Sequence, residues 1–384
     1  MNQEDFSWME RLSNAFGPSG FEEDVTAVAW EYAQEFADVE EDNIRNLYIK
    51  RRSNTGAKPM VMLDAHSDEV GFMVQFIKPN GTLQFLPLGS WNESSIPGTK
   101  VYVRNQKGEY IPGIVAAKPV HFMTKEEANR MPHIQDMVID IGAVSDQEAK
   151  EVFGIQVGDP VAPAVSFQQD PMRGIMTGKA FDCRVGCLAL LKAMKALADE
   201  ELAVDVIGVL SSQEEVGGRG ARVAARHVDP VITLGFEGCP ADDTFTPDYA
   251  VQSAMKKGPM IRLMDVSMIT HPRLAFNAKR NSFHHNFDSE SICSYTTRFC
   301  GHAGSGAGRS GCDRDRKSPD TRVVRKSINL AQKSGVFSVS RGGRRILCIR
   351  SPSPMLYRNR TNEKRGVFFP LNLRPSSIKI SPTT

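Results

Sequence analysis

Several features that would mark a membrane or secreted protein are missing from this 384-residue sequence. No apolar run approaches the roughly 18–20 residues of a membrane-spanning helix, which predicts that the protein has no membrane partner. The amino terminus, Met1-Asn2-Gln3-Glu4-Asp5, has neither the basic nor the apolar region of a secretion signal. The seven cysteines are odd in number and lack a tight spacing pattern, so we expect reduced thiols. These absences predict a cytoplasmic location.

The remaining composition is that of a globular protein, with 41% hydrophobic and 24% charged residues. The length is sufficient for two domains and a well-buried core. Charge is divided unevenly, because residues 277–384 have a net charge of +15 and residues 1–276 have −13. Such an asymmetry is typical of a nucleic-acid-binding or otherwise foreign tail.

Hydrophobic periodicity divides residues 1–276 into two kinds of structure. Helix and strand patterns alternate in residues 1–69 and 166–276, which predicts an α/β domain with a doubly wound, mainly parallel sheet. Residues 70–165 hold short β-like runs between turn signals, which predicts an inserted small β-barrel or sandwich. Expected helices are 4–16, one that begins after Ser19 and presents Phe21, Val25, Val28, Ala29 and Tyr32 on one face, 184–199 and 221–226. Expected strands of the α/β part are 46–50, 59–63, 204–210 and 231–234. Ser19 and Glu22 have the spacing of a capping box for the second helix.

Acidic residues and one histidine follow the predicted strands of the α/β part. They are His66 with Asp68, Asp182, Glu214 with Glu215, and Glu237. Ligands of an open α/β sheet bind outside the carboxyl ends of its strands. Imidazole and carboxylate ligands suit zinc, cobalt or manganese, so the pattern predicts a metal site there.

One assignment gives each of these residues a role at a pair of metal ions. A two-metal site needs a shared carboxylate, and Asp182 would supply it. His66 and Glu237 would then bind one ion and Glu215 the other, which leaves Glu214 as general base. Asp68 would orient the His66 imidazole.

Each residue also has a simpler explanation. Glu214 and Glu215 would also suit a solvated acidic turn, and His66 with Asp68 a local hydrogen bond. Asp182 would also suit a helix cap, and Glu237 a turn. Their shared position after sheet strands favours the metal site.

Four segments resemble the M42 family of metallo-aminopeptidases. They are Leu63 to Phe72 (LDAHSDEVGF), Gly178 to Asp182 (GKAFD), Gln213 to Gly217 (QEEVG) and Phe236 to Asp243 (FEGCPADD). The early Pro18-Ser19-Gly20 and the β insertion match as well, so the resemblance covers residues 1 to about 275.

The resemblance implies a zinc-exopeptidase-like fold and two divalent ions, zinc or cobalt. It implies removal of amino-terminal residues from short peptides, and a homo-oligomer, often a dodecamer, built through the inserted domain. Carried over by motif, the metal ligands are His66, Asp182, Glu215 and Glu237, the base is Glu214, and Asp68 is the partner of His66.

The sequence also departs from the family pattern. A glycine-rich segment of the Gly-Gly-Gly-Thr type, further strands and a late histidine ligand of the second ion are absent, and His302 has no matching context. Activity is therefore expected to be impaired. Cys183 stands where many relatives have Asp or Asn; it is either a packed core cysteine or a soft extra ligand.

Two interpretations of residues 277–384 remain open. The abrupt change in charge, cysteine content and periodicity favours an out-of-frame translation of an ordinary family carboxyl terminus. The other interpretation is a basic arm on an inactive scaffold that binds nucleic acid, although no nucleic-acid-binding motif is present and nucleic acid is not expected as a partner.

Two other enzyme classes also use carboxylates of this kind. A glycosidase needs its two carboxylates on opposite sides of the sugar bond, which neighbours such as Glu214 and Glu215 seldom achieve. A metal-dependent deacylase or carboxypeptidase-type amidase would share the sheet and remains the closer alternative.

The frameshift interpretation predicts the content of the coding DNA. Beyond about codon 277, one of the two alternative reading frames is expected to encode a glycine-rich segment and a late histidine. Sequencing the gene and translating all three frames checks this, and two frames without those features would contradict it.

Overall fold

The computed structural model describes residues 3–255, 260–264, 269–272 and 274, and the backbone of residues 295–296, 338–341 and 344–348. Within this part of the chain, no helix is both long enough and apolar enough to cross a bilayer. Apart from the backbone of those three short strands, residues 277–384 lie outside the described residues, so the structure tests neither interpretation of this segment.

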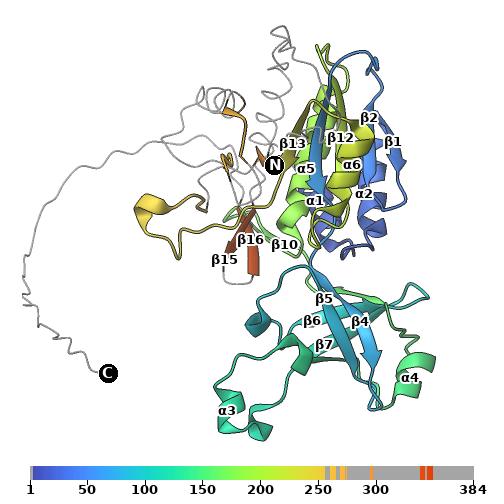
Figure 1. Cartoon of the computed structure of the whole chain (residues 1–384), viewed down its shortest axis with the longest axis vertical. Coiled ribbons are helices and arrows are strands. Elements are labelled where there is room, and N and C mark those ends of the chain that lie inside the picture. The colour runs from blue at the N-terminus through green and yellow to red at the C-terminus, as the bar shows by residue number, and fades with distance from the viewer. Residues whose placement is uncertain are drawn as a thin grey trace, which may run out of the picture. The chain divides into compact units, whose positions relative to one another are not determined.

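A six-stranded mixed sheet forms the centre of the α/β part (Figure 1). Its strands, in spatial order, are β1 (Ala37–Glu41), β2 (Leu47–Arg51), β12 (Asp205–Ser211), β3 (Met60–His66), β13 (Ile232–Phe236) and β14 (Tyr295–Thr296). β3 is parallel to both β12 and β13, whereas β1, β2 and β14 pair antiparallel to their neighbours. The predicted parallel sheet is therefore present as a three-stranded parallel centre with antiparallel edges.

Helices cover both faces of this sheet, as the doubly wound prediction requires. α1 (Gln3–Asn14), α2 (Glu23–Ala33) and α5 (Phe181–Leu197) share one apolar core with the strands. α6 (Arg219–Val228) packs on the other face, where Ala224 contacts a second cluster that includes Met62 and Val209. All five apolar positions that form one face of α5 are buried: Val185, Leu188, Leu191, Met194 and Leu197. The helical spacing of these residues thus correctly indicates which face meets the sheet.

The inserted β structure is a closed barrel (strands β4–β7 are labelled in Figure 1). Its strands are β4 (Gly71–Ile77), β5 (Leu83–Leu88), β8 (Val138–Asp140), β7 (Tyr110–Ala116), β6 (Lys100–Arg104) and β9 (Pro160–Pro163), in order around the barrel. Alternating side chains such as Phe72, Val74, Val101 and Val103 fill its interior. Closure leaves no free strand edge, and it confirms the barrel rather than the sandwich.

The remaining elements are short and lie outside the central sheet and the barrel strands. They are η1 (Glu93–Ser95), η2 (Val120–Phe122), α3 (Lys125–Ala128), η3 (Ile134–Asp136), α4 (Asp146–Glu151), β10 (Gln168–Asp170), β11 (Ile175–Thr177), η4 (Asp248–Ala250), β15 (Ser338–Arg341) and β16 (Arg344–Cys348). β10, β11, β16 and β15 form a separate four-stranded antiparallel sheet in that order.

The predicted capping box at the start of α2 is wrong. Glu22 is the residue that precedes the helix, and no side chain caps the helix amino terminus. The Ser19 hydroxyl instead donates to Asp68 Oδ2 at 2.6 Å, and the Glu22 carboxylate accepts from Gln213 N at 3.0 Å. Ser19 therefore binds a distant partner, and Glu22 shares one oxygen between the nearby Gly20 amide and the distant Gln213 amide.

A buried cation ties the start of α5 to the segments around it. The fully buried Arg184 guanidinium donates to four backbone carbonyls, those of Leu12, Ala15, Gly17 and Ser67. It also lies 3.5 Å from Glu69 Oε1, which accepts from Lys179 Nζ at 2.5 Å. Because Arg184 lies two residues after Asp182 and contacts Ser67, this network fixes the spacing between two predicted site segments.

Arg184→Ala is expected to lower the free energy of unfolding by about 3 kcal/mol or more, because buried carbonyls lose their donors and a buried ion cluster loses one member. Arg11→Ala is the matched control, since its ion pair with Glu31 is exposed and is expected to contribute about 1 kcal/mol or less. Denaturant unfolding of both variants measures the difference. Equal, small losses would show that the buried network contributes little.

Candidate metal centre

The centre lies where β3 and β13 end and α5 begins. His66, the last residue of β3, is 2% exposed. Its Nε2 atom lies 3.0 Å from Asp182 Oδ1 and 3.2 Å from Glu237 Oε1. Asp182 is at the start of α5, and Glu237 directly follows β13. Three residues widely separated in the sequence therefore meet at one edge of the sheet, as the predicted convergence requires.

A fourth side chain, that of Cys183, lies in the same group. One potential ligand atom from each of His66, Asp182, Cys183 and Glu237 lies within 4.8 Å of the others. The Cys183 thiol donates to the carbonyl oxygen of Phe236 at 3.1 Å. Burial raises the pKa of this thiol well above its usual value, which favours the protonated donor. Cys183 thus donates a hydrogen bond to Phe236, the residue before Glu237, and its sulfur also lies close enough to the other three side chains to bind the same metal ion.

Cys187 makes a similar bond one helical turn later. Its thiol donates to the carbonyl oxygen of His66 at 3.1 Å, and burial raises its pKa to about 12. The two thiols of α5 therefore bind the backbone carbonyls of Phe236 and His66, at or next to the predicted ligands Glu237 and His66. Both cysteines are free and buried.

Asp68 lies behind His66 and connects it to the acidic turn. Its Oδ1 is 3.3 Å from His66 Nδ1 and accepts the amide of Glu214 at 2.9 Å. Its Oδ2 accepts the Ser19 hydroxyl and, at 3.1 Å, the amide of Glu215. Although burial raises the pKa of Asp68, the nearby His66 and the hydrogen bonds from Ser19 and Glu214 outweigh it and lower the pKa below its usual value. Asp68 is thus held ionised where it can orient an imidazole.

Glu214 and Glu215 lie on the turn after β12, and both are partly exposed. The amides of Gly217 and Gly218 both donate to the carbonyl oxygen of Glu214 at 2.8 Å. The Glu215 side chain packs against Gly89, where an added Cβ would lie 3.2 Å from the Glu215 Cβ. Glu215 is not in the compact group around His66 within the described residues. The structure therefore brings His66, Asp182 and Glu237 together most closely and leaves Glu215 outside that group.

The electrostatics of the group favour a bound cation. Burial raises the pKa of Glu237 to about 8, and the nearby Asp182 adds to this increase against the opposing effect of His66. Burial alone would lower the pKa of His66, but Glu237, Asp182 and Asp68 together raise it well above its usual value. Partly buried acids that repel each other and share one imidazole are a donor set that a divalent ion would satisfy. The residues present thus fit a divalent metal ion.

Two residues at this centre were not predicted from the sequence as site residues. Ser19 binds Asp68, and Glu22 binds the backbone of the turn that holds Glu214. Their spacing in the sequence equally fits a helix cap, so it gives no separate signal of a tertiary role. The only available indication was that Pro18-Ser19-Gly20 belongs to the family resemblance.

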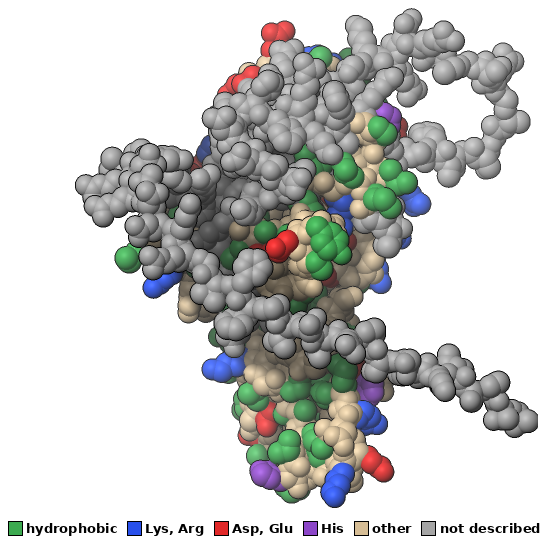
Figure 2. Space-filling model, turned by 90° about the vertical axis from the view of Figure 1, so that its left-hand side faces the viewer, with side chains coloured by type: hydrophobic (Ala, Val, Ile, Leu, Met, Phe, Trp, Pro, Cys, Tyr) green, Lys and Arg blue, Asp and Glu red, His purple; other side chains and the backbone are tan. Residues whose placement is uncertain are grey.

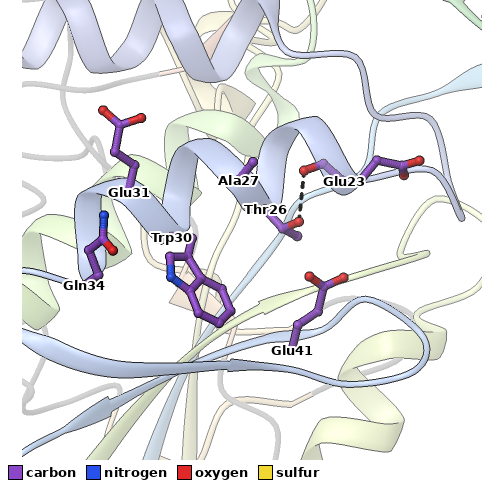
Figure 3. Close-up of a pocket in the computed structure, with 7 residues that line it drawn as sticks. All are labelled: Glu23, Thr26, Ala27, Trp30, Glu31, Gln34 and Glu41. Atoms are coloured by element: carbon purple, nitrogen blue, oxygen red, sulfur yellow. Dashed lines mark hydrogen bonds between the residues drawn. The ribbon is translucent and has the colours of Figure 1, made fainter. Parts of the chain in front are cut away.

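A surface groove of about 500 Å³ lies along α2, away from this group (Figure 3). Figure 3 shows Trp30 extending from α2 toward the ribbon that carries Glu41. The groove is lined by Glu23, Thr26, Ala27, Trp30, Glu31, Gln34 and Glu41. Its acids are already paired with arginines: Glu31 with Arg11, Glu41 with Arg45, and Glu23 with Arg45 and Arg104. None of the predicted ligands lines the groove, so it is separate from the candidate centre.

Comparison with known proteins gives one consistent relationship. Residues 46–298 match the family model described as M42 glutamyl aminopeptidase. The chain is 32% identical to the glutamyl aminopeptidase of Lactococcus lactis subsp. cremoris over 274 residues, which cover 70% of this chain and 75% of that protein.

Solved structures agree with this relationship. A TET aminopeptidase from a marine sediment Thaumarchaeota archaeon is 35% identical, with a TM-score of 0.69 and coverage of 76% of this chain and 82% of that one. The TET1 peptidase of Pyrococcus horikoshii, described as assembling into a tetrahedron or a large octahedral shell, is 28% identical, with a TM-score of 0.66 and coverage of 76% and 86%.

The two roles considered for Cys183 differ in the expected spectrum of a cobalt-loaded protein. Because its thiol is a buried donor to Phe236, we expect cobalt(II) to bind without a thiolate-to-metal charge-transfer band. Cys183→Ser retains a donor and is expected to leave cobalt affinity within about threefold, less than a kcal/mol. Absorption titration with cobalt measures both, and a charge-transfer band that disappears in Cys183→Ser would identify a sulfur ligand.

Proposed function

The chain belongs to the M42 glutamyl aminopeptidase family of metal-dependent peptide hydrolases, and on that premise we propose that it removes amino-terminal residues from short peptides with two divalent ions. His66, Asp182 and Glu237 would hold one ion, with Asp182 shared, and Glu215 would hold the other. Zinc or cobalt suits these imidazole and carboxylate donors.

The chain's own residues would perform the proton transfer and the positioning. Glu214 accepts a proton from the attacking water and delivers it to the leaving amine, the general acid–base role. Asp68 keeps His66 in a fixed orientation through Nδ1 and holds the amides of Glu214 and Glu215. When bound, the two ions would polarise the scissile carbonyl and acidify the water.

The observation that carries this proposal is the geometry around His66 Nε2. Carboxylate oxygens of Asp182 and Glu237 lie 3.0 and 3.2 Å from it. A histidine with two acids on one nitrogen and a third, Asp68, on the other is the arrangement expected around a metal-binding imidazole. A helix cap or a turn residue would not require Asp182 and Glu237 to converge on the same atom.

We further propose that activity is lower than in relatives. The sequence lacks the late histidine that the family resemblance places at the second ion, which leaves Glu215 and the shared Asp182 as that ion's ligands in this chain. Weak binding of the second ion would lower the fraction of active enzyme.

A homo-oligomer, with the dodecamer as the form expected from the family resemblance, is part of the same proposal. Relatives such as the Pyrococcus horikoshii peptidase are described as forming large shells. The barrel exposes large apolar side chains, among them Phe76, Val120, Phe122 and Met131, and green hydrophobic side chains reach the surface in the lower part of Figure 2. Exposed apolar surface of this kind suits contact between subunits.

Peptides with a free and an acetylated amino terminus test the reaction. The full chain loaded with zinc or cobalt is expected to cleave the free peptides only, and chelation is expected to abolish cleavage. Glu214→Gln is expected to lower kcat by about 10²–10⁴-fold with unchanged metal content, whereas Glu151→Gln, on the exposed helix α4, is the matched control.

The same assay separates the alternatives. Cleavage of blocked peptides would favour the deacylase or carboxypeptidase-type amidase, and absence of any metal-dependent cleavage would overturn the proposal. Metal analysis is expected to find fewer than two tightly bound ions per chain. Two tightly bound ions together with ordinary family turnover would contradict the proposed impairment.

A further inference from the structure

In the segment between α1 and α2, the Glu22 side chain binds the turn after β12, which carries Glu214, and does not cap α2. Glu22 Oε1 accepts two backbone amides, that of Gly20 at 2.8 Å and that of Gln213 at 3.0 Å. Gln213 immediately precedes the proposed base, Glu214. A residue near the amino terminus therefore binds the backbone of a turn that begins about 190 positions later.

Three consecutive amides of that turn point at two carboxylates. Gln213 donates to Glu22, and Glu214 and Glu215 donate to the two oxygens of Asp68 at 2.9 and 3.1 Å. Successive backbone amides that converge in this way form an anion-binding nest. Here the anions are the protein's own side chains, so the nest holds the turn in one conformation.

The conformation held in this way is not a relaxed one. Gln213 has a φ of 50°, in the left-handed region that residues other than glycine seldom adopt. Such a backbone persists when its surroundings determine it strongly. The Glu22 bond to the Gln213 amide acts directly at the strained residue.

Glu22 also carries a cost that a purely structural residue would not need. It is 0% exposed, and within the described residues its second oxygen, Oε2, has no hydrogen-bond partner. Burial of a carboxylate without full pairing is unfavourable. A neutral amide of the same length would avoid most of this cost and would still accept the Gln213 amide through its oxygen.

We propose that Glu22 is a positioning residue that, together with Asp68, holds the Gln213–Glu215 backbone so that the Glu214 carboxylate faces the attacking water. This proposal rests on the proposed function, because it assigns Glu22 an effect on the same reaction. Glu22 acts through the turn and does not touch the substrate. Its effect should therefore appear in kcat rather than in KM.

Three substitutions in the full chain separate positioning from general stability. Glu22→Ala removes the acceptor, Glu22→Asp retains the charge but shortens the side chain by one methylene, and Glu22→Gln retains an oxygen acceptor at the same reach. Glu31→Ala is the matched control, because it removes a glutamate from an exposed position on α2. Residue-resolved hydrogen exchange by mass spectrometry reports the Gln213 amide, and free-amine peptides report kcat and KM.

In Glu22→Ala and Glu22→Asp, exchange at Gln213 is expected to be at least about tenfold faster, and kcat at least about tenfold lower at nearly constant KM, since small misplacements of catalytic groups cost up to about 10²-fold. Glu22→Gln and Glu31→Ala are expected to stay within about threefold of the parent chain in both measurements.

Unchanged exchange at Gln213 in Glu22→Asp, or a Glu22→Gln variant as impaired as Glu22→Asp, would overturn the proposal. These comparisons do not need Glu22→Ala to fold. If the parent chain cleaves no peptide, the proposed function fails, while exchange at Gln213 still decides whether Glu22 holds the turn.

Discussion

The parallel register of β3 between β12 and β13 is the constraint on which the rest of the structure depends. It pairs His66 with Ser211 on one side and Asp64 with Gly235 on the other. All three strands therefore end at the same edge, and the residues that follow them enter one small space. A shift of one residue would turn alternate side chains to the opposite face and would separate His66 from Glu237. The backbone pairing of the three strands therefore determines which side chains can meet at this edge.

Further hydrogen bonds around these residues fix the positions of the backbone segments that carry them. The buried thiols of α5 hold the carbonyls of His66 and Phe236, and Asp68 holds His66 and the turn after β12. Arg184 joins the same segments to the end of α1. The bonds made by the two thiols and by Arg184 are buried, where an unpaired group is costly. The precision of the centre therefore depends on residues that would not touch a metal ion.

Much of this architecture could be predicted from the sequence because it depends on local periodicity. The apolar stripe of α5 and the apolar run of β3 indicated buried elements, and alternation with turn signals indicated the barrel. The meeting of His66, Asp182 and Glu237 could be predicted because strand ends share an edge.

The remaining features depend on contacts between distant segments. Ser19 and Glu22 fit a local capping pattern equally well, and only the folded chain shows that Asp68 and Gln213 are their partners. The proximity of the Cys183 sulfur to the ligand group, and the position of Glu215 outside it, likewise depend on backbone geometry at a turn. The antiparallel edge strand β1 has a weak apolar pattern, since only one of its five residues is buried.

The insertion of the barrel between β3 and β12 has a consequence for how the chain is made. The barrel strands are contiguous in sequence, so this part can fold as soon as it leaves the ribosome. β3 must wait for β12 and β13, both synthesised after the whole barrel, before its backbone groups are paired on either side. Domains generally fold as units during synthesis, and contacts between distant segments form slowly. The edge that carries His66 is thus completed late in biogenesis, because the apolar strand β3 has neither of its pairing partners until the barrel has been synthesised.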